Sequence, residues 1–98
     1  MCGIAGILCD DIDTRQEKKM IWQVSNSLKM RGPDARGEYV SRNAVLVHRR
    51  LSIIDPEKGS QPMRFGKYII VYNGEIYNTD EVRRELRFHG YVFDTSCD

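Results

Sequence analysis

Residues 37–51 read GEYVSRNAVLVHRRL, two β-prone runs separated by the polar pair Arg42-Asn43. This order is typical of a β-hairpin, with one strand over residues 37–41 and a second over residues 44–51. A strand pair joined by so short a turn must be antiparallel. The sequence therefore predicts that the chain contains an antiparallel sheet.

The residues before the hairpin predict a strand followed by a helix. The apolar run Ile4–Leu8 has the composition of a buried strand. Thr14 and Glu17 are spaced as in a capping box, in which each side chain satisfies a free amide at a helix start. The helix should end at residues 31–34, RGPD, because proline restricts the residue before it and cannot continue a helix. Its inward face is predicted to hold Met20, Ile21, Val24 and Leu28.

The residues after the hairpin predict a turn, a strand, a second helix and a final strand. The turn covers residues 55–59, and the strand covers residues 67–72, KYIIVY, the most hydrophobic segment of the chain. Asn78 or Thr79 is expected to cap the helix, which ends at Gly90. Val82 and Leu86 are expected to form the inward stripe of this helix. Residues 91–95, YVFDT, are expected to form the last strand. This mixture of helices and antiparallel strands predicts an α+β domain.

Length and composition limit the classes of function. The 98 residues form at most one small domain, 1–98, and they end just after the last predicted strand, which suggests a piece of a longer protein. A formal net charge of +1 lacks the basic excess of a nucleic-acid surface. No apolar run approaches the roughly 20 residues of a membrane span, so no membrane partner and a cytoplasmic location are expected. The three cysteines lack zinc-ligand spacing, and no metal site is expected.

Cys2 directly follows the initiator methionine, and this position allows two interpretations. If Met1 is removed, the thiol and a free α-amine belong to one residue, and an amine with a pKa of about 7.7–8.0 can accept the thiol proton. Cys2 would then be a nucleophile that carries its own base. Alternatively, Cys2 is a small residue of a buried strand, where free cysteine is common. Position alone favours the second interpretation.

Asn73-Gly74 and the arginine pair are also ambiguous. Asn-Gly between β-runs indicates a tight hairpin, but a helix start follows here, so an oxyanion hole made by the Asn73 side-chain amide and the Gly74 backbone amide is equally compatible. Arginine binds a carboxylate through two hydrogen bonds, or simply lies at a solvated strand edge. Side-chain alternation places Arg50 with His48 on one face of the strand and Arg49 on the other. Only one of the two arginines can therefore face a given site.

Several blocks occur in a fixed order along the chain: MCGIAGIL, RGPDARG, HRRLSIID, GSQPM, YNGEIYN and LRFHGYVFDTSCD. They closely resemble the glutaminase domain of class II glutamine amidotransferases and, within that class, the asparagine synthetase type. The resemblance runs from Met1 to Asp98. It implies the N-terminal nucleophile hydrolase fold, an αββα sandwich with antiparallel sheets, of which this chain would supply the first part.

The resemblance also implies roles for individual residues. Cys2, once Met1 is removed, would attack the side-chain amide of glutamine and form a glutamyl thioester. Asn73 and Gly74 match the oxyanion hole. The residues that would bind glutamine are Arg50 at the α-carboxylate, Glu75 and Asp98 at the α-amino group, and Leu51, Ser52, Ile53 and Ile54 along the pocket.

Partners and cofactors follow from the same resemblance. The substrate would be L-glutamine, and the released ammonia would pass to a synthetase domain, normally in the same chain, that uses ATP and magnesium to amidate aspartate in asparagine biosynthesis. These residues contain no such domain and no glycine-rich phosphate loop, so no cofactor is expected here. The full-length protein could form a homodimer. The alternatives are another ammonia acceptor, such as a sugar or a peptide carboxylate, and a non-catalytic truncated fragment.

Overall fold

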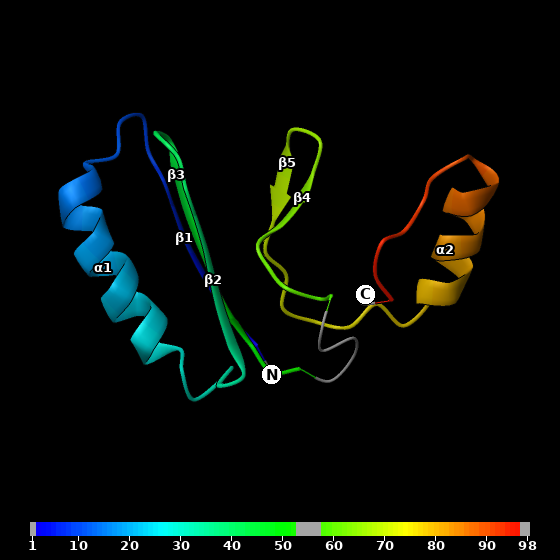
Figure 1. Cartoon of the computed structure of the whole chain (residues 1–98), viewed down its shortest axis with the longest axis horizontal. Coiled ribbons are helices and arrows are strands. Elements are labelled where there is room, and N and C mark those ends of the chain that lie inside the picture. Colours follow the sequence, from blue (N-terminus) through cyan, green and yellow to red (C-terminus); the bar gives the residue numbers. More distant parts are fainter. Residues whose placement is uncertain (1, 53–57, 97–98) are drawn as a thin grey trace.

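The computed structural model describes residues 2–52 and 58–96. The elements follow in the order β1 (Gly3–Leu8), α1 (Thr14–Ser27), β2 (Ala35–Val40), β3 (Ala44–Arg50), β4 (Met63–Phe65), β5 (Tyr68–Ile70) and α2 (Thr79–Phe88). The strands form a three-stranded antiparallel sheet, β1-β3-β2, and a two-stranded antiparallel sheet, β4-β5. From left to right, Figure 1 shows α1, the larger sheet, the β4-β5 hairpin and α2. The predicted α+β class with antiparallel sheets is confirmed.

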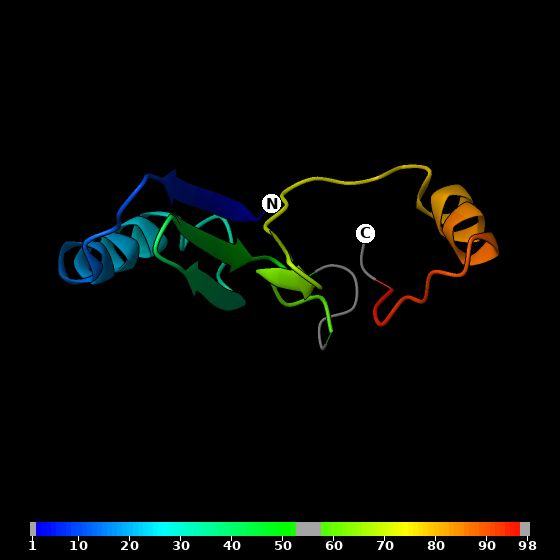
Figure 2. The ribbon, with the colours of Figure 1, turned by 90° about the horizontal axis from the view of Figure 1, so that it is seen from above.

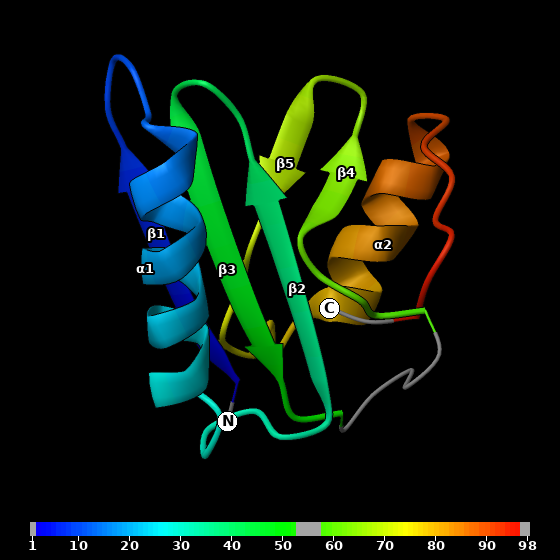
Figure 3. The same ribbon diagram turned by 60° about the vertical axis from the view of Figure 1, so that its left-hand side comes forward.

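β3 is the central strand of the larger sheet (Figure 3). β1 pairs with β3 so that Gly3 lies opposite Arg49, and β2 pairs with β3 so that Gly37 lies opposite His48. The predicted hairpin is confirmed, although β2 begins at Ala35, two residues before the predicted start. Both neighbours are antiparallel, and residues 45–49 of β3 have a defined partner on each side.

A small apolar core lies between α1 and one face of the larger sheet. It consists of Ile12, Ile21, Val45 and Val47, with Ile7 packed against it. Val45 and Val47 are two residues apart on β3 and share this face, as alternation requires. We call this side of the larger sheet, which α1 covers, its inner face and the opposite side its outer face.

Arg49 lies on the inner face and ties β3 to the end of α1. Its Nε donates to the Ser25 carbonyl oxygen at 2.9 Å and to the Ser25 hydroxyl at 3.0 Å, and its Nη2 donates to Asn26 Oδ1 at 3.4 Å. α1 has no basic residue in its last turn, so Arg49 supplies the positive charge that the carbonyl end of a helix favours. Arg49 is thereby committed to the fold, and Arg50 is the arginine on the outer face.

The N-terminal cap of α1 differs from the predicted capping box. The N-cap residue is Asp13 rather than Thr14, and its carboxylate accepts a hydrogen bond from the Arg15 backbone N–H at 3.0 Å. Asp is at least as good a cap as Thr, and it occupies the position one residue earlier. Glu17 is buried, and its Oε2 has no hydrogen-bond partner among the described residues. This burial raises the pKa of Glu17, and the carboxylates of Asp13 and Asp11 raise it further.

The buried face of α1 is also rotated from the prediction. Ile21 is buried as predicted, but Met20 is 41% exposed, and the buried neighbours of Ile21 are Glu17 and Ser25. Successive helix residues are separated by about 100° around the axis, so Met20 points well away from Ile21. The contact of Arg49 with Ser25 orients the helix, and a sequence pattern of the helix alone contains no information about this partner.

The smaller sheet was only half predicted. β5 covers part of the predicted strand 67–72, whereas β4 was not predicted. The pairing stops at Met63 because the preceding residue, Pro62, has no N–H to donate to a ladder. The Tyr72 N–H donates instead to Gln61 Oε1 at 2.5 Å. The chain therefore leaves the sheet before Tyr72, and a side chain replaces the ladder hydrogen bond there.

The two sheets meet on the outer face. His48 is 1% exposed, and its Nε2 lies 3.3 Å from the Tyr72 carbonyl oxygen. A Cβ at Gly37 would come within 1.8 Å of the Gln61 carbonyl oxygen, so only glycine allows the backbone of residue 61 to approach β2 this closely. We call Gly37, His48, Gln61 and Tyr72 the sheet joint, because they connect the larger sheet to the β4-β5 hairpin.

α2 packs less than predicted. Asn78 occupies the N-cap position, and Gly90 follows the helix with a φ of 91°, both as predicted, but the Asn78 side chain makes no capping hydrogen bond. No residue of α2 is buried, and Val82 of the predicted inward stripe is 38% exposed. Figure 2 shows α2 at one end of the molecule, away from both sheets. Neither helix of the described part has the length and apolar character to cross a membrane.

The predicted last strand, residues 91–95, is wrong. This segment folds back along α2, where Arg83 donates to the Thr95 carbonyl oxygen at 2.8 Å and lies over the Phe93 ring at 4.6 Å from its centroid. A strand requires a neighbour for its ladder, and none of the described strands pairs with this segment.

Arg49→Met tests the contact between β3 and α1. Methionine keeps the aliphatic stem but removes the charged donor from the Ser25 oxygens, so the free energy of unfolding should fall by about 1.5–3 kcal/mol. Arg36→Met, at the exposed position opposite Arg49 on β2, is the matched control and should change it by no more than about 0.5 kcal/mol. Urea unfolding measures both variants, and equal losses would contradict the role of Arg49.

His48 predicts a stability that decreases in acid. Burial lowers the pKa of His48 from 6.5, the hydrogen bond to Tyr72 opposes this shift, and the Arg50 charge adds to it. Above about pH 6.5, His48 is neutral in the folded and the unfolded chain, so it contributes no pH dependence. Below that pH the unfolded chain binds the proton first, and the free energy of unfolding falls until the folded histidine is protonated as well.

His48→Gln cannot titrate and should remove this part of the decrease below about pH 6.5. His89→Gln changes the other histidine, which is exposed, and should leave the decrease in place. Urea unfolding at several pH values measures both variants. An identical acid decrease in His48→Gln and the unaltered chain would show that His48 is not the group responsible.

Candidate functional site

Cys2 lies just before β1 and beside the end of β3. Its Sγ accepts a hydrogen bond from the Leu51 backbone N–H at 3.3 Å and lies 3.7 Å from the Leu51 carbonyl oxygen. The Cys2 carbonyl oxygen accepts a hydrogen bond from Arg31 Nε at 3.3 Å. The residue is half-buried. The sulfur atom is therefore held by the main chain that follows β3, and part of the residue remains accessible.

The sheet register places Arg50 next to Cys2. Because Gly3 lies opposite Arg49, one further step along the register puts Cys2 opposite Arg50. Directly opposed residues of an antiparallel pair share a face of the sheet. Arg50 lies on the outer face, like His48, and is 5% exposed. The structure thus brings together the predicted nucleophile and the predicted carboxylate-binding cation.

The loop between α1 and β2, residues 31–34, braces this end of β3. A Cβ at Gly32 would lie 2.3 Å from the carbonyl carbon and oxygen of Arg49, so the loop packs directly on the main chain of β3. The Asp34 N–H donates to the Arg50 carbonyl oxygen at 2.9 Å, and Asp34 Oδ2 accepts from the Ser52 N–H at 2.7 Å. α1 ends at Ser27, before the end predicted at residues 31–34, so the block RGPD does not end the helix but holds the residues around Arg50.

The sequence pattern does not predict this bracing role. Arg31, Gly32 and Asp34 contact residues 16 to 29 positions away in sequence, and no local periodicity reports such contacts. The one local signal for such a role is indirect: Gly, Pro and Asp are residues that favour turns, and an Asp side chain often hydrogen-bonds to nearby backbone groups. The pairing of these residues with Cys2 and with the end of β3 emerges only when the loop is folded.

Asn73 and Gly74 follow β5 through Tyr72, a member of the sheet joint. Asn73 is half-buried and Gly74 is exposed. No strand follows before α2, so Asn73-Gly74 is not the turn of a tight hairpin. The joint attaches this segment to His48. On β1, Ile4 lies opposite His48, and Cys2 is two residues, about 7 Å, before Ile4. Figures 1 and 2 both show the start of β1 near the segment that leaves β5.

The other predicted glutamine-binding residues are placed as follows. Leu51 and Ser52 are half-buried, Leu51 contacts Cys2, and Glu75 is exposed on the segment after Gly74. Ile53, Ile54 and Asp98 lie outside the described residues, as does Met1. Among the residues that are described, no three His, Cys, Asp or Glu side chains come together in a way that could hold a metal ion.

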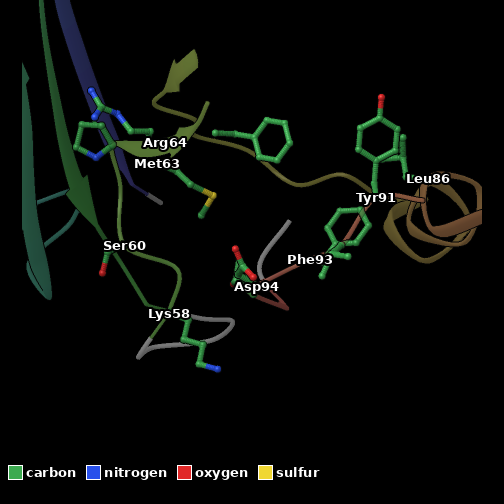
Figure 4. Close-up of a pocket in the computed structure, with 12 residues that line it drawn as sticks. Lys58, Ser60, Met63, Arg64, Leu86, Tyr91, Phe93 and Asp94 are labelled. Carbon is green, nitrogen blue, oxygen red and sulfur yellow. The ribbon is translucent and has the colours of Figure 1, made fainter. Parts of the chain in front are cut away.

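A separate hollow lies between β4 and the segment after α2 (Figure 4). Its volume is about 830 Å³, and Met63 and Phe93 lie on opposite sides of it. Cys2, Arg50 and Asn73 are absent from its lining. This hollow is therefore not part of the candidate site.

The candidate site combines three kinds of chemistry at one end of the larger sheet. The thiol of Cys2 can attack a carbonyl carbon. The guanidinium of Arg50 can bind a carboxylate through two hydrogen bonds. Amide donors such as those of Asn73 and Gly74 can stabilise an oxyanion. Such a set suits a small molecule that carries both a carboxylate and a reactive carbonyl group.

Comparisons with known proteins agree with this chemistry. Residues 1–98 match the family model described as a glutamine amidotransferase domain. Over its whole length, the chain is 37% identical to the glutamine-hydrolyzing asparagine synthetase 3 of Bacillus subtilis and 40% identical to asparagine synthetase 1 of Arabidopsis thaliana and the nodule asparagine synthetase of Pisum sativum. The chain spans 17% of the length of each of these relatives. It belongs to the glutamine amidotransferase domain family.

Proposed function

We propose that this chain forms part of the glutaminase of a glutamine-hydrolysing asparagine synthetase. Its reaction is the hydrolysis of the side-chain amide of L-glutamine to glutamate and ammonia through a cysteinyl thioester. The observation that carries the proposal is the position of Cys2, whose sulfur is held by the Leu51 N–H next to the buried Arg50. A structural cysteine in a buried strand has no need for a buried cation beside it.

The first half of the reaction forms the thioester. After Met1 is removed, the α-amine of Cys2 takes the thiol proton, and the thiolate sulfur attacks the amide carbon of glutamine. Negative charge develops on the amide oxygen, where the Asn73 side-chain N–H and the Gly74 backbone N–H stabilise it. The intermediate then breaks its carbon–nitrogen bond, the amine returns its proton to the departing nitrogen, and ammonia leaves.

The second half uses the same groups. The α-amine removes a proton from water, and the water oxygen attacks the thioester carbon. The oxyanion again lies at Asn73 and Gly74. The carbon–sulfur bond then breaks, the thiol of Cys2 recovers its proton, and glutamate is released. No external oxidant, reductant or metal is required for either half.

Recognition of glutamine is assigned to the predicted binding residues. Arg50 binds the α-carboxylate, and the residue is 5% exposed, so the interaction lies in a medium where water screens charge weakly. Glu75 and Asp98 receive the α-ammonium group, while the main chain of residues 51–54 lines the pocket. The residue set is thus complementary to a molecule that is charged at its α-carbon and neutral at its amide.

The wider setting is also part of the proposal. The succession of α1, the larger sheet, the β4-β5 hairpin and α2 supports the first part of the αββα sandwich of N-terminal nucleophile hydrolases (Figure 1). Ammonia passes to a synthetase domain of the same cytoplasmic, homodimeric protein, where ATP and magnesium serve the amidation of aspartate. No glycine-rich phosphate loop occurs in these 98 residues, so ATP and magnesium are assigned to that other domain.

An electrophilic analogue of glutamine, such as a diazoketone amino acid, tests the proposal. It should alkylate Cys2 in chains that have lost Met1, and peptide mass spectrometry reads both events in one spectrum. Asn73→Ala should slow the labelling by about a hundredfold or more, because one donor to the oxyanion is lost. Arg50→Lys should weaken binding of the analogue, because a single ammonium cannot replace the two-pronged guanidinium.

Cys9→Ser is the matched control, because Cys9 is exposed and remote from the proposed chemistry. It should leave the labelling of Cys2 unchanged. Equal labelling of Cys2, Cys9 and Cys97 would contradict the proposal. Retention of Met1 on an unlabelled chain would favour the non-catalytic alternative.

A further inference from the structure

We propose that His48 is a positioning residue for the oxyanion hole, which it aligns by holding the peptide bond between Tyr72 and Asn73. The inference rests on the function proposed above. His48 would not contact glutamine itself, but would act through the main chain on residues that do.

The contacts of Tyr72 carry the argument. Its N–H donates to Gln61 Oε1 at 2.5 Å, and its carbonyl oxygen lies 3.3 Å from His48 Nε2. A carbonyl oxygen only accepts, so Nε2 must carry the proton and His48 must be the Nε2–H tautomer. Both polar groups of the Tyr72 main chain are thus held by side chains rather than by a sheet ladder.

The consequence for Asn73 follows from peptide geometry. The carbonyl carbon of Tyr72 is bonded to the nitrogen of Asn73, and the peptide group between them is planar. A donor that holds the Tyr72 carbonyl oxygen therefore also holds the peptide plane that contains the Asn73 nitrogen. Two anchors, His48 and Gln61, then determine the direction in which the chain enters the proposed hole.

The Tyr72 side chain reaches the second donor of the hole. Its hydroxyl oxygen lies 2.6 Å from the position that a Cβ at Gly74 would occupy. The phenol ring of Tyr72 therefore lies against the Gly74 main chain. A shift of Tyr72 away from His48 would move both proposed donors, the side chain of Asn73 and the backbone N–H of Gly74.

The hydrogen bond to Tyr72 explains why a polar side chain, rather than an apolar one, occupies position 48. It is 1% exposed on the outer face of β3, a position where an aliphatic side chain would fill space without the cost of burying a polar ring. Its hydrogen bond to Tyr72 accounts for the polar group. The same strand carries Arg50 two residues later, and Leu51, the residue that follows the strand, donates its N–H to the Cys2 sulfur. One strand thus sets the nucleophile, the carboxylate anchor and the oxyanion hole relative to one another.

The test compares variants of the full chain in glutamine hydrolysis. His48→Leu removes the donor and keeps an aliphatic volume, and kcat should fall about tenfold to a hundredfold. KM should stay within about twofold, because Arg50 is untouched. His48→Gln places an amide N–H where Nε2–H stood and should restore most of kcat. His89→Leu alters the exposed histidine and is the matched control, with unchanged kcat and KM.

If His48→Leu does not fold, Gln61→Met tests the same positioning role. Methionine is close to glutamine in shape but accepts no hydrogen bond from the Tyr72 N–H, so kcat should fall with KM preserved, as for His48→Leu. A folded His48→Leu or Gln61→Met variant with unaltered kcat would overturn the positioning role. Equal loss in His48→Leu and a folded His48→Gln would overturn it too, because the N–H would then not be the feature that matters.

The tautomer of His48 in the unaltered chain is a further test of the positioning role. Nitrogen-15 NMR of the histidine rings should show His48 as the Nε2–H tautomer, with its proton protected from solvent exchange. The Nδ1–H tautomer would overturn the inference whatever the variants do. An unaltered chain that neither hydrolyses glutamine nor reacts with the diazoketone analogue overturns the proposed function itself, a result distinct from an active chain indifferent to His48.

Discussion

The alternation of side chains along β3 is the constraint on which the rest of the structure depends. Because the strand has neighbours on both sides, each of its residues must face either α1 or the outer surface. Arg49 turns inward and holds the last turn of α1, while His48 and Arg50 turn outward. The two adjacent arginines therefore have different partners, and a slip of one residue in register would exchange them.

Polar contacts replace much of what a larger apolar core would do. The described core contains four buried apolar residues, and His48, Arg49 and Arg50 are buried as well. Buried polar groups are tolerated when they are hydrogen-bonded, and the partners of Arg49 and His48 come from distant parts of the chain. These contacts also specify direction, because hydrogen bonds depend on angle while apolar packing does not.

The sequence predicted the elements whose signal is local. The strand at residues 4–8, the hairpin with its turn at Arg42-Asn43, and both helices are present, although α1 ends at Ser27, before the end predicted at residues 31–34. β4 was missed because three residues carry little pattern, and the strand expected at 91–95 is absent because Arg83 holds that segment along α2. In the site, Cys2, Arg50 and Asn73-Gly74 were recognisable as candidates, but neither the brace of residues 31–34 nor the sheet joint was.

The sequence by itself determined which side chains are available: a thiol behind Met1, an arginine pair in one strand, and an Asn-Gly pair after another. It also determined that these stand in blocks that resemble one family. Only the tertiary structure decided which arginine serves the site, that the Leu51 N–H holds the Cys2 sulfur, and that His48 reaches Tyr72. The physical reason is that a local pattern records which face of an element a residue occupies, whereas its hydrogen-bond partner depends on strand register and on close approaches such as those at Gly32 and Gly37.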